Sequence, residues 1–212
     1  MPRPGNKRYH HGDLRAALIE TAAELIAERG MRGFSLAEAS RRLGVAVSAP
    51  YAHFTDRDDL LAAVTVHAYE LCYAELVSGT RQVSQPADRL AAMARRYIRF
   101  AAEYGPLFEM LYESGLDKAS HPEIEAAERP LTDAFLGCVR ALSRGEDPGG
   151  EALPEDLATA VEATAYGHAR LLLDDGAGQG ADAVELAAER AARATLALIE
   201  SRRLLGRPGT GP

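Results

Sequence analysis

The stretch FSLAEASRRLGVAVSAPYAHF, residues 34–54, determines the fold predicted for this chain. In its first half, apolar residues from Leu36 to Leu43 recur at helical spacing and share one face. Gly44 follows, and glycine supplies the left-handed backbone that commonly ends a helix. A second short helix is expected over 47–53. Two short helices joined by a glycine-containing turn form the helix-turn-helix layout that enters the DNA major groove.

The composition predicts a globular protein. The chain has 212 residues, of which 47 % are hydrophobic and 26 % charged, enough for a sizeable core. No apolar run reaches the roughly 18 residues of a membrane helix, and no apolar segment follows the basic N-terminus, so neither a membrane span nor a secretory signal is expected. Cys72 and Cys138 lack metal-ligand spacing and fit buried thiols in a reducing cytoplasm. We therefore expect no metal and no cofactor.

The charge is distributed unevenly along the chain. The net charge is −7, yet residues 1–60 carry nine basic and eight acidic side chains, whereas the remainder carries 15 and 23. The first eleven residues hold Arg3, Lys7 and Arg8 and no acid. A near-neutral head with a basic arm on an acidic body suits a protein that touches DNA at one end.

Helix-forming residues dominate, and glycine and proline clusters divide the chain into segments. We predict an all-α fold: a flexible arm over 1–11, a three-helix DNA-binding head over 12–66 and a larger helical body over 67–206. Within the head, Ser35 should cap a helix with Glu38 at capping-box spacing, and Asp13 should lie in a first turn. The expected helices, about nine in number, are 12–30, 36–43, 47–53, 57–78, 87–104, 107–113, 122–144, 153–175 and 182–204.

The motifs of the head resemble those of the TetR-type bacterial transcription regulators. The resemblance runs from about residue 11 to 66 and rests on Ala22-Ala23-x-Leu25-Ile26-x-x-x-Gly30, Phe34-Ser35-Leu36-x-x-Ala39, Leu43-Gly44-Val45 and Tyr51-x-His53-Phe54-x-Asp56-Arg57-x-x-Leu60-Leu61. His10-His11-Gly12-Asp13-Leu14 and the Tyr166–Gly176 segment are similar to the branch with a WHG-type C-terminal domain. In this chain the tryptophan of that signature is missing and its His-Gly order is reversed.

The resemblance implies which residues of the head meet DNA. Val47, Ser48 and Ala49 would face base edges, whereas Tyr51 and His53 would bind phosphates or, alternatively, pack against the next helix. Ser35, Arg42 and Arg57 complete the implied DNA-binding set. Arg41 could replace Arg42, and Arg57 could instead pair with a neighbouring aspartate; the N-terminal arm could enter the minor groove or stay solvated.

Two departures from the family pattern affect the second short helix. Ala46 lacks the hydroxyl that often caps it. Pro50 disfavours helical geometry at Ala49, so this helix should start late, with Ser48 as its cap. Phe54 is expected in the core.

Two helices of the body carry small and apolar side chains at helical spacing. By resemblance they pair with the same helices of a second chain, although an intramolecular core is the alternative. The residues of this expected dimer contact are Val161, Ala165, His168, Leu172, Ala187, Ala191, Ala194 and Leu198.

The helices between 57 and 144 would enclose a ligand cavity. Its expected lining is Tyr73, Met93, Tyr97, Phe100, Phe108, Leu111, Phe135 and Tyr166, with Tyr69, Tyr104 and Cys138 as further candidates. Plain core packing is the alternative for each of these residues. Their aromatic character and scarcity of charge indicate a hydrophobic or planar ligand.

The sequence thus predicts a DNA-binding regulator, a repressor released from its operator by a small ligand. Its expected partners are double-stranded operator DNA, a second copy of the chain and an unidentified inducer. A DNA-binding regulator without small-molecule control is the first alternative. A helical enzyme using His168 with Asp174 or Asp175 is a remote one, since no nucleophile motif or phosphate loop accompanies these residues.

Overall fold

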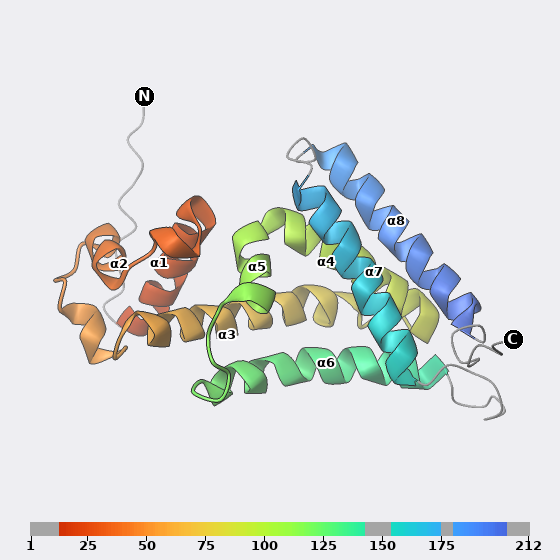
Figure 1. Cartoon of the computed structure of the whole chain (residues 1–212), viewed down its shortest axis with the longest axis horizontal. Coiled ribbons are helices and arrows are strands. Elements are labelled where there is room, and N and C mark those ends of the chain that lie inside the picture. The colour runs from red at the N-terminus through yellow and green to blue at the C-terminus, as the bar shows by residue number, and fades with distance from the viewer. Residues whose placement is uncertain (1–12, 143–153, 175–179, 203–212) are drawn as a thin grey trace, which may run out of the picture. The chain divides into compact units, whose positions relative to one another are not determined.

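A computed structural model of the chain describes residues 13–142, 154–174 and 180–202 (Figure 1). The predicted N-terminal arm, Asp175 and most of two glycine- and proline-containing stretches, 145–154 and 176–181, whose composition predicts exposed loops, lie outside this range. The described part is helical throughout and contains no strand, which confirms the all-α prediction. It holds eight α-helices and three short 3₁₀ helices, close to the nine helices expected. The chain divides after Val64 into two compact units.

The first unit is a small helical head. It contains α1 (Leu14–Arg29), η1 (Met31–Gly33), α2 (Leu36–Leu43), η2 (Ala49–Ala52) and the first residues of α3 (Arg57–Leu76). Helices α1 and α2 pack on each other and on η2. Its core is formed by large apolar side chains that exclude water almost completely, and burial of such side chains is the main stabilising force of a small domain. They include Leu18, Leu25, Ile26, Phe34, Leu36, Phe54 and Leu60.

Side-chain caps define where the first two long helices of the head begin. The Ser35 hydroxyl accepts a hydrogen bond from the Glu38 backbone N–H at 3.2 Å, as the capping pattern predicts. The Glu38 carboxylate is bound by Arg29 at 3.3 Å and Arg41 at 2.5 Å. Asp13 is the N-cap of α1, where its carboxylate accepts from Ala16 N–H at 2.9 Å, and not a first-turn residue as expected.

The turn after α2 has the geometry that the sequence predicts. Gly44 has φ 71° and ψ 26°, in the left-handed region. Its N–H donates to the Arg41 carbonyl at 3.2 Å, and the next N–H, of Val45, donates to the Ser40 carbonyl at 3.0 Å. These two bonds form a Schellman motif, which satisfies carbonyls that the helix end would otherwise leave unpaired.

The predicted second helix of the motif is shorter and tighter than expected. Instead of an α-helix over 47–53, a turn leads into the 3₁₀ helix Ala49–Ala52. Pro50 has no N–H, so the α-helical bond to Ala46 is impossible, and Ala49 donates to Ala46 instead at 2.9 Å. The late start is confirmed. Ser48 occupies the cap position, but its side chain makes no capping bond.

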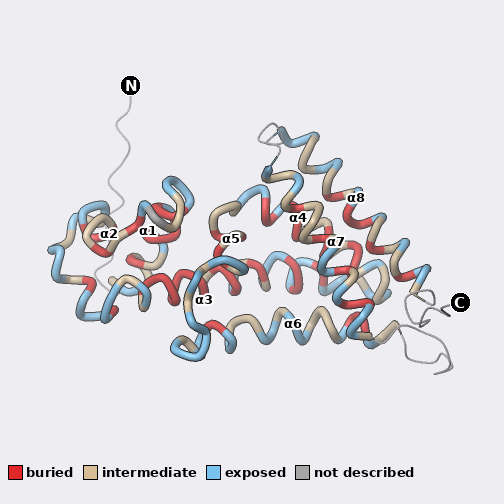
Figure 2. The backbone as a smooth tube through the Cα atoms, viewed as in Figure 1, coloured by how far each residue is buried: buried red, intermediate tan, exposed pale blue. Residues whose placement is uncertain are grey.

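The second unit packs its helices around α4. It contains the rest of α3, η3 (Ser78–Thr80), α4 (Pro86–Glu103), α5 (Gly105–Glu113), α6 (Pro122–Leu142), α7 (Pro154–Asp174) and α8 (Ala181–Glu200). Helix α4 contacts α5, α6, α7 and α8, and α8 also lies along α7. Figure 2 shows α8 with buried residues on one side and exposed residues on the other, the pattern of an amphipathic surface helix.

Helix α3 bears on the prediction that the chain contains no membrane span. By length and composition, the stretch Arg57–Thr80 is apolar enough to cross a bilayer, contrary to the sequence-based expectation. However, 61 % of its most apolar window is buried inside the protein, where Leu60, Val64 and Cys72 are fully enclosed. A buried helix of this kind is a core helix whose apolar side chains pack against protein.

Candidate functional site

The surface of the first unit presents the side chains predicted to read DNA. Val47 is 52 % exposed and Tyr51 60 % exposed, unusually high for side chains of their size. Ser48 and His53 are exposed as well, and Ala49 is half-buried. Buried Pro50 and Phe54 anchor the segment between them. The exposure of Tyr51 and His53 leaves both free to meet a partner, because neither is buried against the following helix.

Arg42, predicted to contact DNA, is held by acidic side chains of α1. Its guanidinium donates to both Glu28 carboxylate oxygens at 2.9 and 2.6 Å, and lies 3.9 Å from Glu24. Hydrogen bonding to Arg42 lowers the pKa of the Glu28 carboxyl. Arg41 is the more accessible of the two arginines, with 66 % of its side chain exposed.

Arg57 links several segments of the head. Its Nη2 donates to the Met31 carbonyl at 2.6 Å and its Nε to the Phe34 carbonyl at 3.4 Å. The guanidinium also lies 5.4 Å from the Phe34 ring centroid, within cation–π range. An ion pair with Asp58 at 3.3 Å, foreseen as the alternative, is present too. Arg57 therefore ties the start of α3 to η1 and to the entry of α2.

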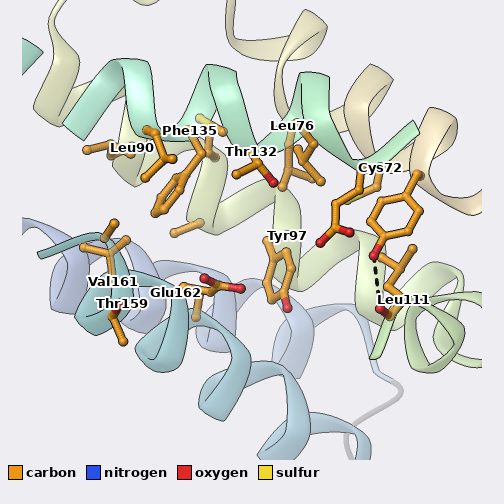
Figure 3. A pocket seen from close by; sticks show the side chains of 18 of the residues that line it. Cys72, Leu76, Leu90, Tyr97, Leu111, Thr132, Phe135, Thr159, Val161 and Glu162 are labelled. Carbon is orange, nitrogen blue, oxygen red and sulfur yellow. Dashed lines mark hydrogen bonds between the residues drawn. The ribbon is translucent and has the colours of Figure 1, made fainter. Parts of the chain in front are cut away.

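The second unit contains a cavity of about 640 Å³ (Figure 3). Four of the eight residues predicted to line it do so: Met93, Tyr97, Leu111 and Phe135. Tyr69, a further candidate, lines it as well. Residues from α3, α4, α5, α6 and α7 all contribute to its wall. The residues that sequence reasoning missed are Cys72, Leu76, Leu90, Ala94, Tyr112, Lys118, Glu128, Leu131, Thr132, Leu136, Glu155, Ala158, Thr159, Val161, Glu162 and Ala165.

The other four predicted lining residues lie outside the cavity wall. Phe100 and Phe108 are almost completely buried in the core and are not among the residues that line the cavity. Tyr166 stacks on Phe108 with ring centroids 6.2 Å apart. Tyr73 is packed against the core beside the face of α3 that carries Tyr69 and Cys72. For these four residues the alternative of plain packing is correct.

Three tyrosines form a polar group within the apolar wall. The Tyr69 hydroxyl donates to the Leu111 carbonyl at 3.1 Å, and the Tyr97 and Tyr112 hydroxyls hydrogen-bond to each other. Burial raises the pKa of each of these hydroxyls, and the nearby negative charge of Glu162 adds to the rise. All three phenols therefore stay neutral at physiological pH.

The cavity carries more charge than the sequence indicates. Lys118 and Glu128 form an ion pair of 2.5 Å at the wall, and Glu155 and Glu162 of α7 also line it. The expectation of few charges is therefore wrong. Folding brings the acidic residues of α7 beside the aromatic residues of α3 to α6, and the sequence pattern did not predict this proximity. Periodicity within one helix carries no information about which helix it will face.

Cys72 lies in the cavity wall as an inert thiol. Burial raises its pKa to about 12, so the nucleophilic thiolate is scarce at neutral pH. Both cysteines are free and buried, as predicted. Among the described residues, no group of three His, Cys, Asp or Glu side chains could hold a metal ion.

The predicted dimer stripes are only partly available to a second chain. Val161, Ala165 and Ala191 are buried within the single chain, the first two at the cavity wall, so they belong to the intramolecular core. Leu172, Ala187 and Leu198 are half-buried against the same core, Ala194 is half-buried, and His168 hydrogen-bonds the Thr164 carbonyl at 2.8 Å. Among the large apolar side chains of these helices in the described ranges, Leu171 at 68 % and Leu186 at 48 % are exposed.

Comparison with known families decides the identity of the chain. Residues 18–64 match the family of bacterial regulatory proteins called tetR, and residues 90–195 match the tetracyclin repressor-like C-terminal domain. The chain belongs to the TetR family. It is accordingly a DNA-binding transcriptional regulator, and the family indicates regulation in place of the enzymatic alternative. The WHG-type branch stays a prediction.

Relatives of this TetR-family chain have names that agree with a role in transcription regulation. An uncharacterised HTH-type transcriptional regulator of Mycobacterium tuberculosis is 29 % identical over 142 residues, covering 66 % of this chain and 71 % of the relative. The HTH-type transcriptional activator FasR of Mycolicibacterium smegmatis is 27 % identical over 158 residues, covering 71 % and 69 %.

Solved structures share the fold. A protein of unknown function from Rhodococcus sp. RHA1 aligns with a TM-score of 0.70 at 27 % identity, covering 89 % of this chain and 98 % of that one. FadR from Bacillus subtilis, in complex with stearoyl-CoA, aligns with a TM-score of 0.68 at 16 % identity, covering 87 % and 96 %. AibR, in complex with isovaleryl coenzyme A and operator DNA, aligns with a TM-score of 0.55 at 23 % identity, covering 71 % of this chain and 83 % of that one.

Proposed function

We propose that this TetR-family protein is a cytoplasmic repressor that leaves its operator when a small hydrophobic ligand fills the cavity of the second unit. The observation that carries the proposal is the cavity of about 640 Å³. Its volume falls within the roughly 300–1,000 Å³ of small-molecule sites, and most of its lining residues are apolar or aromatic. A regulator without small-molecule control has no need of such a space, because protein interiors otherwise pack tightly.

Two structural neighbours support a small ligand in this place. FadR was solved with stearoyl-CoA, and AibR with isovaleryl coenzyme A together with operator DNA. Their identity to this chain is low, so they support the idea that a body of this fold accepts a small molecule and leave the chemistry of the ligand open.

Helix α3 is the element through which the ligand would act. It begins three residues after buried Phe54, at the end of the recognition segment, and carries Tyr69, Cys72 and Leu76 of the cavity wall. A ligand shifts DNA affinity only when it binds one conformation of this helix better than another. We infer that the DNA-bound form has the lower affinity for ligand.

We also propose the DNA contacts. Tyr51 and His53 would bind phosphates, while Val47, Ser48 and Ala49 would meet base edges in the major groove. Ser35 lies at the N-terminus of α2, where free backbone N–H groups favour a phosphate. Arg42 and Arg57 would reach DNA only by giving up contacts within the head, so we rank them below Tyr51 and expect Arg41 to be the more available cation.

Operator binding requires two heads if the half-sites are symmetric. We propose that the protein is a homodimer formed through the outer faces of α7 and α8. Exposed Leu171 and Leu186 would lie in this contact, with half-buried His168, Leu172, Ala187, Ala194 and Leu198 around them.

The proposal is tested on DNA from upstream of the gene and of its neighbours. Footprinting at low salt should find a site, whose occupancy should fall steeply with salt because phosphate contacts release counterions. Small hydrophobic molecules added at fixed DNA should release the protein, and a reporter gene should then be expressed. Specific binding that no ligand changes would support the uncontrolled regulator, and ligand-dependent activation would replace the repressor by an activator such as FasR.

A further inference from the structure

The charged side chains of the cavity wall are the feature that the proposed function does not use. They are Lys118, Glu128, Glu155 and Glu162, three acids and one base. Lys118 is already paired with Glu128 at 2.5 Å. The wall therefore has an excess of two negative charges.

The two remaining acids differ in their surroundings. Glu155 lies in the first turn of α7, where the positive end of the helix dipole stabilises a carboxylate. Glu162 lies in the middle of α7, far from either helix end. Across the described ranges 13–142, 154–174 and 180–202, it forms no ion pair. Glu162 is thus an exposed acid of the wall that forms no ion pair with the described residues and is not at a helix end, so its carboxylate is available to a ligand.

Aromatic rings lie next to this carboxylate. Figure 3 shows Glu162 pointing into the cavity toward the ring of Tyr97. Burial is the main cause of the raised pKa of Tyr69, Tyr97 and Tyr112, and the charge of Glu162 contributes a smaller part of the rise for each of them. In the same view Leu90, Phe135 and Val161 lie on the side of Glu162 away from Tyr97, so the cavity offers apolar surface as well.

Resting on the ligand control proposed above, we propose that the natural ligand is a hydrophobic organic cation, whose positive charge lies beside Glu162 and the tyrosine rings. A cation is attracted by the carboxylate and by the negative faces of aromatic rings. Its apolar part fills the space lined by Leu90, Phe135 and Val161. A fatty-acid carboxylate or another anion would bring its charge toward two acids whose only basic neighbour in the wall is already paired.

The test uses three probes with the same ten-carbon chain: decyltrimethylammonium, decanol and decanoate, each below its micellar concentration. Calorimetric titration of the full-length protein without DNA should show the ammonium binding at least about tenfold more tightly than the other two. Glu162→Gln should remove most of that preference, and Glu162→Lys should turn it toward decanoate. Glu70→Gln, which makes the same charge change at an exposed position of α3 outside the cavity wall, should leave it unchanged.

The outcomes separate this inference from the proposed function. Equal binding of decanol and the ammonium, tighter binding of decanoate, or equal loss in the Glu162 and Glu70 variants would each overturn the cationic ligand. If decanol binds as tightly as the ammonium and releases the protein from its operator, ligand control is supported and the cationic ligand is contradicted. Tight, Glu162-dependent ammonium binding without any change in operator affinity would keep the cation site and overturn ligand control.

Discussion

At the scale of single residues, side chains with a similar place in the sequence have different tasks. More than half of the Tyr51 and Val47 side chains is exposed, whereas Arg42 and Arg57 are bound by Glu28 and by backbone carbonyls. Each of these two arginine side chains near the DNA-binding motif thus makes structural contacts within the head. In the proposed DNA contacts, the base edges are met by the small side chains of Val47, Ser48 and Ala49, so we expect direct base readout to come from few contacts.

Tyr51 and Val47 should differ in how their loss affects DNA binding. Tyr51→Phe removes a phosphate contact and should weaken all operators alike, by about 1 kcal/mol or somewhat more. Val47→Ala should relax the preference at one base pair per half-site and leave the salt dependence nearly unchanged. Selection of operator libraries with each variant measures both effects. A changed preferred sequence for Tyr51→Phe, with an even loss of affinity for Val47→Ala, would reverse our orientation of the recognition segment.

At the scale of elements, the helix-turn-helix depends on backbone geometry that specific residues impose. Gly44 at φ 71° ends α2 and directs the chain into the recognition segment. Pro50 then prevents an α-helix, and the segment forms the short 3₁₀ helix Ala49–Ala52, with Pro50 buried inside it and Phe54 buried just after it. An element this short would limit the number of base pairs that the proposed recognition segment can contact.

Two glycine substitutions should have opposite effects on stability. Gly44→Ala forces a side chain into left-handed backbone and should lower the free energy of unfolding by about 1–2 kcal/mol. Gly137→Ala lies inside α6 with nothing near the added methyl group, and should raise it by up to about 1 kcal/mol. Urea unfolding monitored by circular dichroism gives both values. Equal stability of the two variants would argue against the left-handed turn at Gly44.

The pairing of α4 with α8 should make stability depend on pH. Arg99 donates to Glu185 at 2.8 and 2.7 Å, and this hydrogen bonding lowers the pKa of the Glu185 carboxyl. Because the folded pKa lies below the unfolded value near 4.3, the stabilisation is present above that value and is lost as the pH falls through the folded pKa.

Glu185→Gln should therefore destabilise the protein at pH 7 and matter less as the pH falls below about 4. Thermal unfolding across pH 3–8 measures this difference, with Glu70→Gln as the matched control for loss of one negative charge. The same difference from wild type at every pH would show that the ion pair contributes nothing.

At the scale of the whole molecule, each of the two units has one task. The first presents exposed recognition residues on a compact core, and the second encloses a cavity between helices that belong to different parts of the chain. The net negative charge beyond residue 60 disfavours nonspecific DNA binding there, which agrees with the proposal that the head makes the DNA contacts.

The dimer should depend on the exposed face of α7. Leu171→Glu places a charge on a side chain that is 68 % exposed in the single chain, so the protomer should fold normally. Sedimentation should show monomers, and operator binding should fall because one head alone makes half the contacts. Ala119→Glu adds the same charge at an exposed position between α5 and α6, outside the two helices of the proposed interface, and should leave the dimer intact. A dimeric Leu171→Glu protein would place the interface elsewhere.

The sequence alone determined the all-α fold, the turn at Gly44, the cap at Ser35 and the resemblance to the family, because these follow from local spacing and backbone chemistry. Only the tertiary structure decided which face of each helix meets which neighbour. Leu157, Val161 and Ala165 form an apolar stripe that suits a dimer contact as well as a core, and packing placed Val161 and Ala165 at the cavity wall beside Glu162. The cavity wall gathers charged residues from different helices, and Arg42 and Arg57 are bound by Glu28 and by the Met31 carbonyl. These partners are distant in sequence, so helical periodicity does not predict that they meet.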